Sequence, residues 1–285
     1  MTAVPPLPAP VLETIDGVEI ATYRLDPEGP HSAGDVVLCH GTPWSAAVWM
    51  PVARMLAREH RVHLWDMPGY GASIRSGGAA VDLVSQRRRL ASLLETWQLP
   101  RPHVIAHDIG GAVALGAHLL DGSEYASLHL VDVVTLDPWG SPFFRLVAQH
   151  EQVFAALPPA LHAALVREYI AGAGGQALTD PQIDALTEPW RSPAGQAAFY
   201  RQIAQLSPQH TAPIVERLDQ VRCPSRVSWG EEDPWIPVEQ AAELAARLPG
   251  HVEVRTHAGA GHLVPLEAAD ALGRDALAWL EGSAP

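Results

Sequence analysis

Residues 103–116 read HVIAHDIGGAVALG, which is a short apolar run, an aspartate, and then a run rich in Ala and Gly. The first part has the β-branched and apolar residues of a buried strand, and the second has the composition of a buried helix. A strand that turns sharply into a helix exposes the side chain at the turn, and small neighbours leave room for the crowded backbone. The stretch therefore predicts an α/β fold with Asp108 at the tip of such a turn.

A carboxylate at this tip restricts the chemistry that the chain can perform. Attack on an ester or amide carbonyl would form a mixed anhydride, which is higher in energy than the substrate. Attack on a saturated carbon that carries an epoxide oxygen or a halide gives an ordinary ester, which a base-activated water can hydrolyse. Asp108 could instead only cap the predicted helix 109–120, which is a common role for Asp. The other motifs of the chain decide between a helix cap and a nucleophile.

Strand-like and helix-like segments alternate along the chain, as in a mostly parallel sheet covered by helices. The expected elements are a hairpin in 12–25, strands at 35–40, 61–66, 102–107, 127–136, 224–229 and 251–256, and helices at about 47–58, 82–97, 109–120, 214–220, 237–248 and 264–281. Residues 138–213 interrupt the alternation with helical stretches and no clear strand. We expect 1–137 and 214–285 to form a core domain and 138–213 to form a helical cap over the ligand-binding edge of the sheet.

Three further segments follow predicted strands, so they would meet Asp108 at one edge of the sheet: HGTPW at 40–44, WGEEDPWIP at 229–237 and GAGHLVPLE at 259–267. The backbone N–H groups of Thr42 and Ile109 would face the turn and form an oxyanion hole. Asp233 and His262 complete the chain order of nucleophile, acid and histidine.

The whole set resembles one known family. HGTP, DMPGYGAS at 66–73, AHDIGG, the G-x-x-D-x-x-x-P pattern from Gly230 to Pro237, and GHLVPLE stand in the order typical of α/β-hydrolase fold enzymes. The aspartate at the turn makes the chain similar to the aspartate-nucleophile branch, which contains epoxide hydrolases and haloalkane and haloacetate dehalogenases. The resemblance covers nearly the whole chain and implies an eight-stranded, mostly parallel sheet with helices on both faces and an inserted helical cap.

Alternatives remain open for several of these residues. Asp233 could be a helix cap in front of a proline, and Asp137 is a rival acid because some family members take it from that position. His40 and His107, beside the motifs, are interpreted as structural hydrogen-bonding residues.

The leaving group depends on the cap. The residues that bind halide in haloalkane dehalogenases, an Asn after the HG pair and a Trp after the nucleophile, are replaced by Thr42 and Ile109, and the arginines of haloacetate dehalogenases are also missing. An epoxide oxygen needs a proton or a strong hydrogen bond as it leaves, and phenol groups are suited to this. Tyr200, in a segment AFYRQ that is similar to one in epoxide hydrolases, and Tyr169 are the candidates.

The predicted function is therefore an epoxide hydrolase that forms an alkyl ester on Asp108 and hydrolyses it with water activated by His262. The nearest alternative is a dehalogenase that uses the N–H groups of Trp44, Trp139 or Trp190. An alternative of another class is a non-catalytic member of the fold that binds a ligand. Trp44 and Trp139 are expected to line a pocket for a small, mainly apolar organic substrate.

Composition excludes other classes. The chain of 285 residues has 19 Lys and Arg against 32 Asp and Glu, a net charge of −13 with no extended basic cluster, so nucleic acid is not an expected partner. Neither a signal peptide nor an apolar run of about 18 residues is present, so a cytoplasmic protein without membrane contact is expected. Two cysteines predict no disulfide framework. No metal-ligand spacing or phosphate loop is visible, no cofactor is expected, and the protein would be a monomer or a homodimer.

Overall fold

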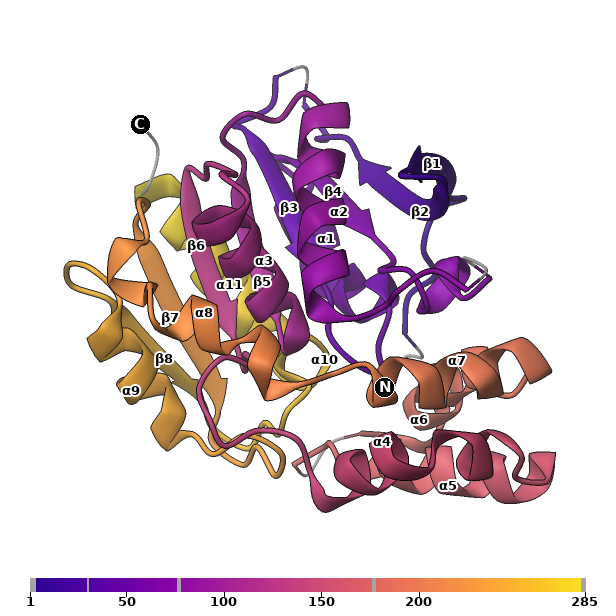
Figure 1. Cartoon of the computed structure of the whole chain (residues 1–285). Coiled ribbons are helices and arrows are strands. Elements are labelled where there is room, and N and C mark those ends of the chain that lie inside the picture. The colour runs from indigo at the N-terminus through magenta and orange to yellow at the C-terminus, as the bar shows by residue number, and fades with distance from the viewer. Residues whose placement is uncertain (1–3, 30, 76–77, 176–177, 283–285) are drawn as a thin grey trace.

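The computed structural model describes residues 4–29, 31–75, 78–175 and 178–282, and its centre is a single eight-stranded sheet (Figure 1). The strands are β1 (Val11–Ile15), β2 (Val18–Leu25), β3 (Asp35–Cys39), β4 (Arg61–Trp65), β5 (His103–His107), β6 (Ser127–Val131), β7 (Ser225–Gly230) and β8 (Glu253–His257). Their order across the sheet is β1-β2-β4-β3-β5-β6-β7-β8. The pairs β1–β2 and β2–β4 are antiparallel, and all other neighbours are parallel. The predicted α/β-hydrolase fold is confirmed.

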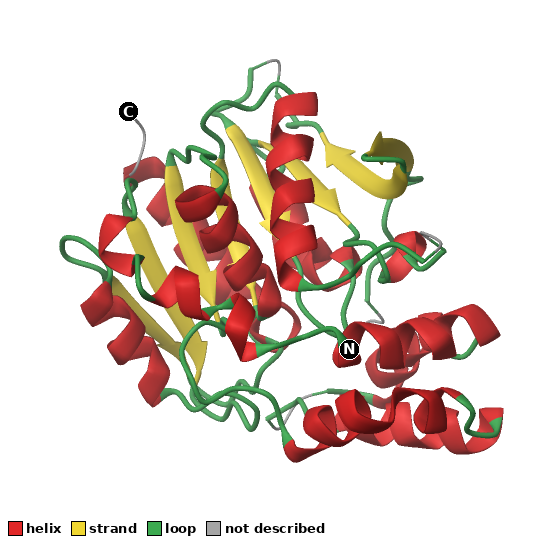
Figure 2. Cartoon of the chain, viewed as in Figure 1, coloured by secondary structure: helices red, strands yellow, loops and turns green. Residues whose placement is uncertain are grey.

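Helices cover both faces of the sheet, as Figure 2 shows. The helices of the core are α1 (Met50–Leu56), α2 (Leu83–Thr96), α3 (Ile109–Leu120), α8 (Ala212–Val215), α9 (Glu239–Arg247), α10 (Val264–Glu267) and α11 (Ala269–Gly282). On one face α2 packs against α3, and on the other α1 packs against α11. The central strands β5 and β6 are buried along their full length, because both of their faces are covered.

Four helices form a separate layer at one end of the molecule, beyond the arrowheads of the parallel strands (Figure 1). They are α4 (Pro142–Ala155), α5 (Pro159–Ala171), α6 (Asp180–Thr187) and α7 (Pro193–Ala204). They lie within the segment 138–213 that the sequence predicts to be a cap, and we use the word cap for that segment below. The cap faces the edge of the sheet where the side chain of Asp108 lies.

Several predicted elements are shorter than expected. The strand expected at 127–136 ends at Val131, because Asp132 takes a left-handed φ of +45° that a strand cannot contain. The closing helix expected at 264–281 is divided at Ala268 into α10 and α11. The helix expected at 214–220 is a short α8 followed by a 3₁₀ turn at Leu218–Gln220.

Candidate active site

The turn between β5 and α3 places Asp108 as the sequence predicts. Asp108 has φ +53° and ψ −127°, a backbone conformation that is rare for residues other than glycine. The turn also needs glycine neighbours: a Cβ on Gly41 would overlap the Asp108 side chain, and one on Gly110 would overlap the carbonyl oxygen of His40. Side chains are thus excluded around the turn, while the carboxylate of Asp108 is held at its tip.

One oxygen of this carboxylate lies on one of the two N–H groups that are predicted to form an oxyanion hole. The N–H of Thr42 donates to Asp108 Oδ1 over 2.6 Å. Ile109, whose N–H begins α3, lines the same cavity as Asp108 and Thr42. A helix N-terminus favours negative charge, so this side of the carboxylate faces groups that stabilise an anion.

The other oxygen faces an imidazole. His262 Nε2 lies 3.3 Å from Asp108 Oδ2, and His262 Nδ1 lies 2.8 Å from Asp233 Oδ2. The side chains of His262 and Asp233 are fully buried, and that of Asp108 is 4% exposed. The structure therefore brings the three residues into one continuous chain of contacts, from three loops that follow β5, β7 and β8.

Asp233 contacts His262 and also fixes a turn. It does not cap a helix, as the alternative supposed, because α9 begins only at Glu239. Asp233 Oδ1 accepts hydrogen bonds from the backbone N–H groups of Trp235 and Ile236, at 2.8 and 3.0 Å, which fixes the turn after β7. Its Oδ2 remains for His262. A carboxylate held by the backbone in this way cannot rotate freely, so it orients the imidazole.

The rival acid Asp137 does not take this role. Asp137 is exposed and lies in a different cavity, beside Trp139, whereas His262 Nδ1 is paired with Asp233. Another carboxylate, Asp132, was not predicted as a site residue; it directly follows β6 and is fully buried. Asp132 Oδ1 accepts from the N–H of Gly230 at 2.7 Å, and Oδ2 has no hydrogen-bond partner among the described residues. The sequence could have indicated Asp132, because it is the first polar residue after the apolar run of β6.

These charges shift the pKa of the buried groups. Burial lowers the pKa of His262, but the carboxylates of Asp233 and Asp108 outweigh that effect and raise it well above its ordinary value. Burial also raises the pKa of Asp132 well above the usual range for aspartate, and the nearby charge of Asp233 adds to the shift. The imidazole is therefore a much stronger base than an isolated histidine while Asp108 is ionised.

The neighbouring histidines have structural roles, as expected. His107 Nε2 donates to the carbonyl oxygen of His262 over 2.7 Å, and its pKa is lowered to about 4, mainly by burial and then by the charge of His262. His40 Nδ1 donates to the carbonyl of Gly41, and its Nε2 accepts from the N–H of Met67. Both rings hold the loops of the site in place.

A cavity of about 250 Å³ opens above Asp108 between the core and the cap. Its walls are mostly apolar, and none of the described side chains that line it is cationic. The lining residues are Thr42, Asp108, Ile109, Val134, Trp139, Gly140, Ser141, Pro142, Phe144, Tyr169, Pro234, Trp235 and Ile236. Tyr169 stacks on Trp235, with ring centroids 4.8 Å apart. No hydrogen bond within the described residues holds the hydroxyl of Tyr169, so it is available to a bound molecule.

The second cap tyrosine lies elsewhere. The hydroxyl of Tyr200 is 2.9 Å from His162 Nδ1, and His162 Nε2 donates to the carbonyl of Trp190. Tyr200 is fully buried, packs against Phe154, and is not among the residues that line the cavity. The structure does not bring Tyr200 to Asp108, because its side chain points into the cap.

The tryptophans also differ from expectation. Trp139 lines the cavity as predicted. Trp44 does not line it, but stacks on the lining residue Trp235, with ring centroids 5.7 Å apart. The N–H of Trp139 donates to Thr211 Oγ1, that of Trp190 donates to the carbonyl of Pro43, and that of Trp44 is buried with no hydrogen-bond partner among the described residues. Two of the three N–H groups are therefore already paired within the protein, and Trp44 is not among the residues that line the cavity.

A contact between cap and core was not visible in the sequence. Gln202, on α7, accepts hydrogen bonds from Thr42 Oγ1 at 2.6 Å and from the Tyr70 hydroxyl at 2.8 Å. All three side chains are buried. The cap thus contacts the loop that carries the N–H group of Thr42.

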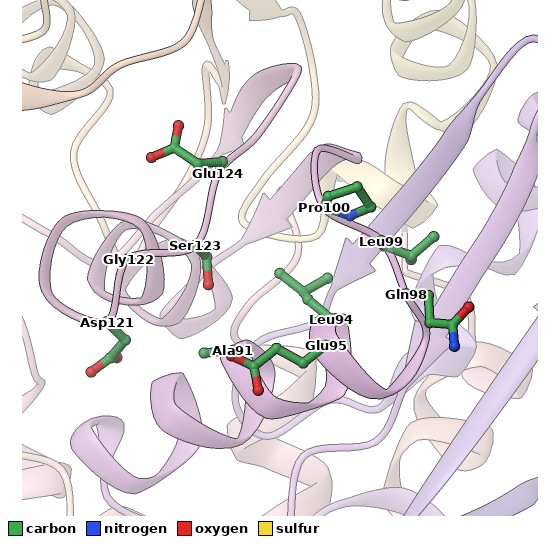
Figure 3. Close-up of a pocket in the computed structure, with 10 residues that line it drawn as sticks. All are labelled: Ala91, Leu94, Glu95, Gln98, Leu99, Pro100, Asp121, Gly122, Ser123 and Glu124. Atoms are coloured by element: carbon green, nitrogen blue, oxygen red, sulfur yellow. The ribbon is translucent and has the colours of Figure 1, made fainter.

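A larger hollow, of about 540 Å³, lies at the opposite end of the sheet, where α2 ends and β5 begins (Figure 3). Its lining includes Leu94, Pro100 and the acidic side chains of Glu95, Asp121 and Glu124. Two of these carboxylates are already paired, Asp121 with Arg87 and Glu124 with Arg222. The smaller cavity is lined by Asp108, which contacts Thr42 and His262, whereas two of the three carboxylates of the larger hollow are already paired with arginines. This difference favours the smaller cavity as the functional site.

Within 4–29, 31–75, 78–175 and 178–282, no group of three or more His, Cys, Asp or Glu side chains could hold a metal ion. Among the same residues, every helix is too short or too polar to cross a membrane.

Comparison with known proteins agrees with this geometry at the level of the family. A family model described as the alpha/beta hydrolase family matches residues 36–274. The solved structure of an alpha/beta hydrolase fold protein from Burkholderia ambifaria is similar, with a TM-score of 0.89 and 44% identity, covering 95% of this chain and 98% of that one.

More distant relatives have different activities. The dihydrolipoyllysine-residue acetyltransferase component of an acetoin cleaving system from Pseudomonas putida is 25% identical over 96% of this chain and 70% of its own length. A fluoroacetate dehalogenase from a Burkholderia species is 28% identical over 58% of this chain and 61% of its own length. The residues of the site therefore have to decide the chemistry.

Proposed function

Since the chain belongs to the alpha/beta hydrolase family, we propose that it opens the C–O bond of an epoxide through a covalent ester on Asp108 and releases a diol. The observation that carries the proposal is the position of the Asp108 carboxylate, with Oδ1 on the N–H of Thr42 and Oδ2 facing His262 beside an apolar cavity. This arrangement matches a nucleophile whose ester is afterwards hydrolysed.

In the first step, Asp108 Oδ2 attacks the less hindered carbon of the epoxide in line with the C–O bond that breaks. Tyr169 donates its proton to the departing oxygen, because its side chain lines the cavity and its hydroxyl is in no hydrogen bond among the described residues. The product is a hydroxyalkyl ester whose carbonyl oxygen is Asp108 Oδ1, still bound by the N–H of Thr42.

In the second step, His262 takes a proton from water, and the hydroxide adds to the carbonyl carbon of the ester. The N–H groups of Thr42 and Ile109 stabilise the oxyanion that forms on Oδ1, and each such donor typically contributes about 3 kcal/mol. When the intermediate collapses, the proton on His262 passes to the leaving alkoxide and the diol is released. The carboxylic acid left on Asp108 gives its proton back to His262, which restores the Asp108 carboxylate. Asp233 keeps the imidazole oriented throughout.

The charge state of His262 follows the reaction. In the free enzyme, Asp108 and Asp233 raise the pKa of His262 and favour the imidazolium. Formation of the ester removes the negative charge of Asp108, so the pKa of His262 falls and the neutral base needed for the second step becomes available. The proton that His262 loses on ester formation restores the hydroxyl of Tyr169, which gave its own proton to the departing oxygen.

The cavity supports a small, mainly apolar and uncharged substrate. Its walls carry aromatic and aliphatic side chains and no cation that could pair with a carboxylate. Diol formation from a panel of neutral epoxides, measured beside halide release from haloalkanes and haloacids with Asp108→Asn as the control, tests the proposal. Diol formation that requires Asp108 supports it, and turnover of halides alone overturns it.

A dehalogenase that uses the same nucleophile is the second candidate. Its support is the similarity to the fluoroacetate dehalogenase and Trp235, which lines the cavity with its indole N–H in no hydrogen bond within the described residues. The lack of a cation in the cavity wall disfavours a haloacid, so this candidate predicts release of halide from neutral haloalkanes. Trp235→Phe would then lower halide release much more than diol formation.

A further inference from the structure

A segment of the cap lies directly on the loop that carries His262. The N–H of His262 donates to the carbonyl of Ala173 over 3.0 Å. Gly175 and Gly261 pack backbone against backbone, and a Cβ on Gly175 would lie 2.8 Å from the nitrogen of Gly261. No side chain fits between the two segments, so the contact needs both glycines.

One carboxylate joins the two segments. Glu267, the last residue of α10, accepts at Oε2 from the N–H of Gly175 at 2.9 Å and from that of Gly261 at 3.0 Å. Its Oε1 accepts from the N–H of Leu263 at 3.0 Å. Hydrogen bonds to an ionised acceptor are stronger than neutral ones, so Glu267 fixes the residues on both sides of His262 and the cap segment together.

The cap segment also carries the other half of the chemistry. Ala173 follows α5 closely, and Tyr169 lies on α5 only four residues before it. The path from the Tyr169 backbone to the His262 backbone therefore passes through one helical turn and one hydrogen bond. Any movement of the cap segment on the His262 loop would displace the tyrosine hydroxyl relative to Asp108.

We propose that Glu267 is a positioning residue that holds Tyr169 and His262 in register with Asp108, so that it supports both steps of the reaction. This inference rests on the proposed function. The proposed role of Glu267 differs from those of Tyr169 and His262. Loss of Tyr169 should slow only ester formation and loss of His262 only ester hydrolysis, whereas loss of Glu267 should slow both steps.

The kinetic test uses the full chain with Glu267→Gln, and Glu239→Gln, at an exposed position of α9, as the matched control. Single-turnover reactions with a neutral epoxide give the rate constants of ester formation and hydrolysis. We expect Glu267→Gln to lower both by about tenfold or more, since small displacements of reacting groups are costly, and Glu239→Gln to lower neither. A variant in which only hydrolysis slows, or neither step does, overturns the proposal.

Gly175→Ala tests the same contact from the cap side, with Glu267 intact. It should also slow both steps, and its effect should not add to that of Glu267→Gln in the double variant, because both break one contact. Additive effects, or an unchanged rate of ester formation, contradict the proposal.

Amide hydrogen exchange reports the contact without any chemistry. Peptides within 168–175 and 258–264 should both exchange faster in Glu267→Gln than in the parent protein, while the peptides of α2 stay unchanged. Faster exchange in the His262 loop alone would contradict a joint role. If both peptides respond and no variant forms an ester on Asp108, the proposed function fails while the positional role of Glu267 stands.

Discussion

The edge of the sheet and the cap hold their functional side chains by different means. Asp108, Asp233 and His262 follow strand ends, and their oxygen and nitrogen atoms are fixed by backbone N–H groups and by one another at 2.6 to 3.3 Å. The two tyrosines of the cap lie on neighbouring helices within one aromatic cluster. One of them lines the cavity, and the other donates its hydroxyl inside the cap.

The difference shows what sets the direction of a side chain in each region. At the end of a parallel strand, the sheet fixes where the following loop begins, so residues from different strands converge on one edge. On a cap helix, the direction depends on the rotation of the helix and on its partners, and one position along the helix turns a side chain by about 100°. Functional groups at the edge of the sheet are thus set by topology, and those of the cap by packing.

The largest expected effect is at the edge of the sheet. Asp108→Asn removes the nucleophile and should lower kcat for epoxide hydrolysis by about 10⁴-fold or more. Asp137→Asn, which changes an exposed carboxylate near the same edge, should retain nearly full activity. Steady-state diol formation by both variants checks this, and a large loss in Asp137→Asn would contradict the assignment of the acid to Asp233.

Replacement of the base should separate the two steps. In His262→Gln the ester should form at a rate within a few-fold of the parent, whereas its hydrolysis should slow by about 10³-fold, because general base catalysis is lost. Intact-mass measurement after mixing with substrate should show an adduct, and peptide mapping should place it on Asp108. An active substrate that leaves no adduct would argue against an ester intermediate.

The cap tyrosines give the sharpest test of the comparison itself. Tyr169→Phe should lower the rate of ester formation by about 10²-fold, because the departing oxygen loses its proton donor. Tyr200→Phe removes a hydroxyl that contacts His162 and should change that rate by only a few-fold. Stopped-flow measurements of ester formation compare the pair directly, and equal effects would mean that the cap does not discriminate between them.

The smallest expected effect is a shift of a titration curve. The asparagine side chain in Asp108→Asn is uncharged, as Asp108 is in the ester. The substitution therefore removes one of the charges that raise the pKa of His262. The titration midpoint of His262 should therefore fall by at least about one pH unit in Asp108→Asn relative to the parent. Histidine NMR, assigned with a His262 variant, checks this, and an unchanged midpoint would show that Asp108 does not control the base.

Ester hydrolysis should depend on pH in the corresponding direction. It needs neutral His262, so its rate constant should rise with pH and become constant above the pKa of His262 in the ester. That midpoint should lie below the midpoint of the free enzyme. A rate constant that falls as pH rises through this range would contradict the assigned role.

Much of the sheet edge was predictable because its signals are local. The strand before Asp108, the glycines after it, and the order of Asp108, Asp233 and His262 are all readable along the chain. The end of β6 was not, because the predicted strand continued through an apolar run after Asp132, whose left-handed backbone ends it. The same error directed attention to Asp137 and away from the buried Asp132.

The cap was less predictable because its contacts join distant residues. The motif around Tyr200 indicated a catalytic residue. The folded structure shows that its hydroxyl instead donates a hydrogen bond to His162, 38 positions away. The contact of Gln202 with Thr42 spans 160 positions and has no local signature. The hydrogen bonds of Glu267 to Gly175 and Gly261 join two segments that are distant in the sequence and adjacent only in the folded chain.

A single turnover in ¹⁸O-labelled water, with enzyme in excess, shows whether a carbon atom of the substrate becomes bonded to Asp108. Water that attacks the ester carbonyl leaves its oxygen in the Asp108 carboxylate, so the label should appear in the peptide that contains Asp108 and not in the diol. Label found only in the diol after the first turnover would mean that water attacks the substrate directly and that no ester forms on Asp108.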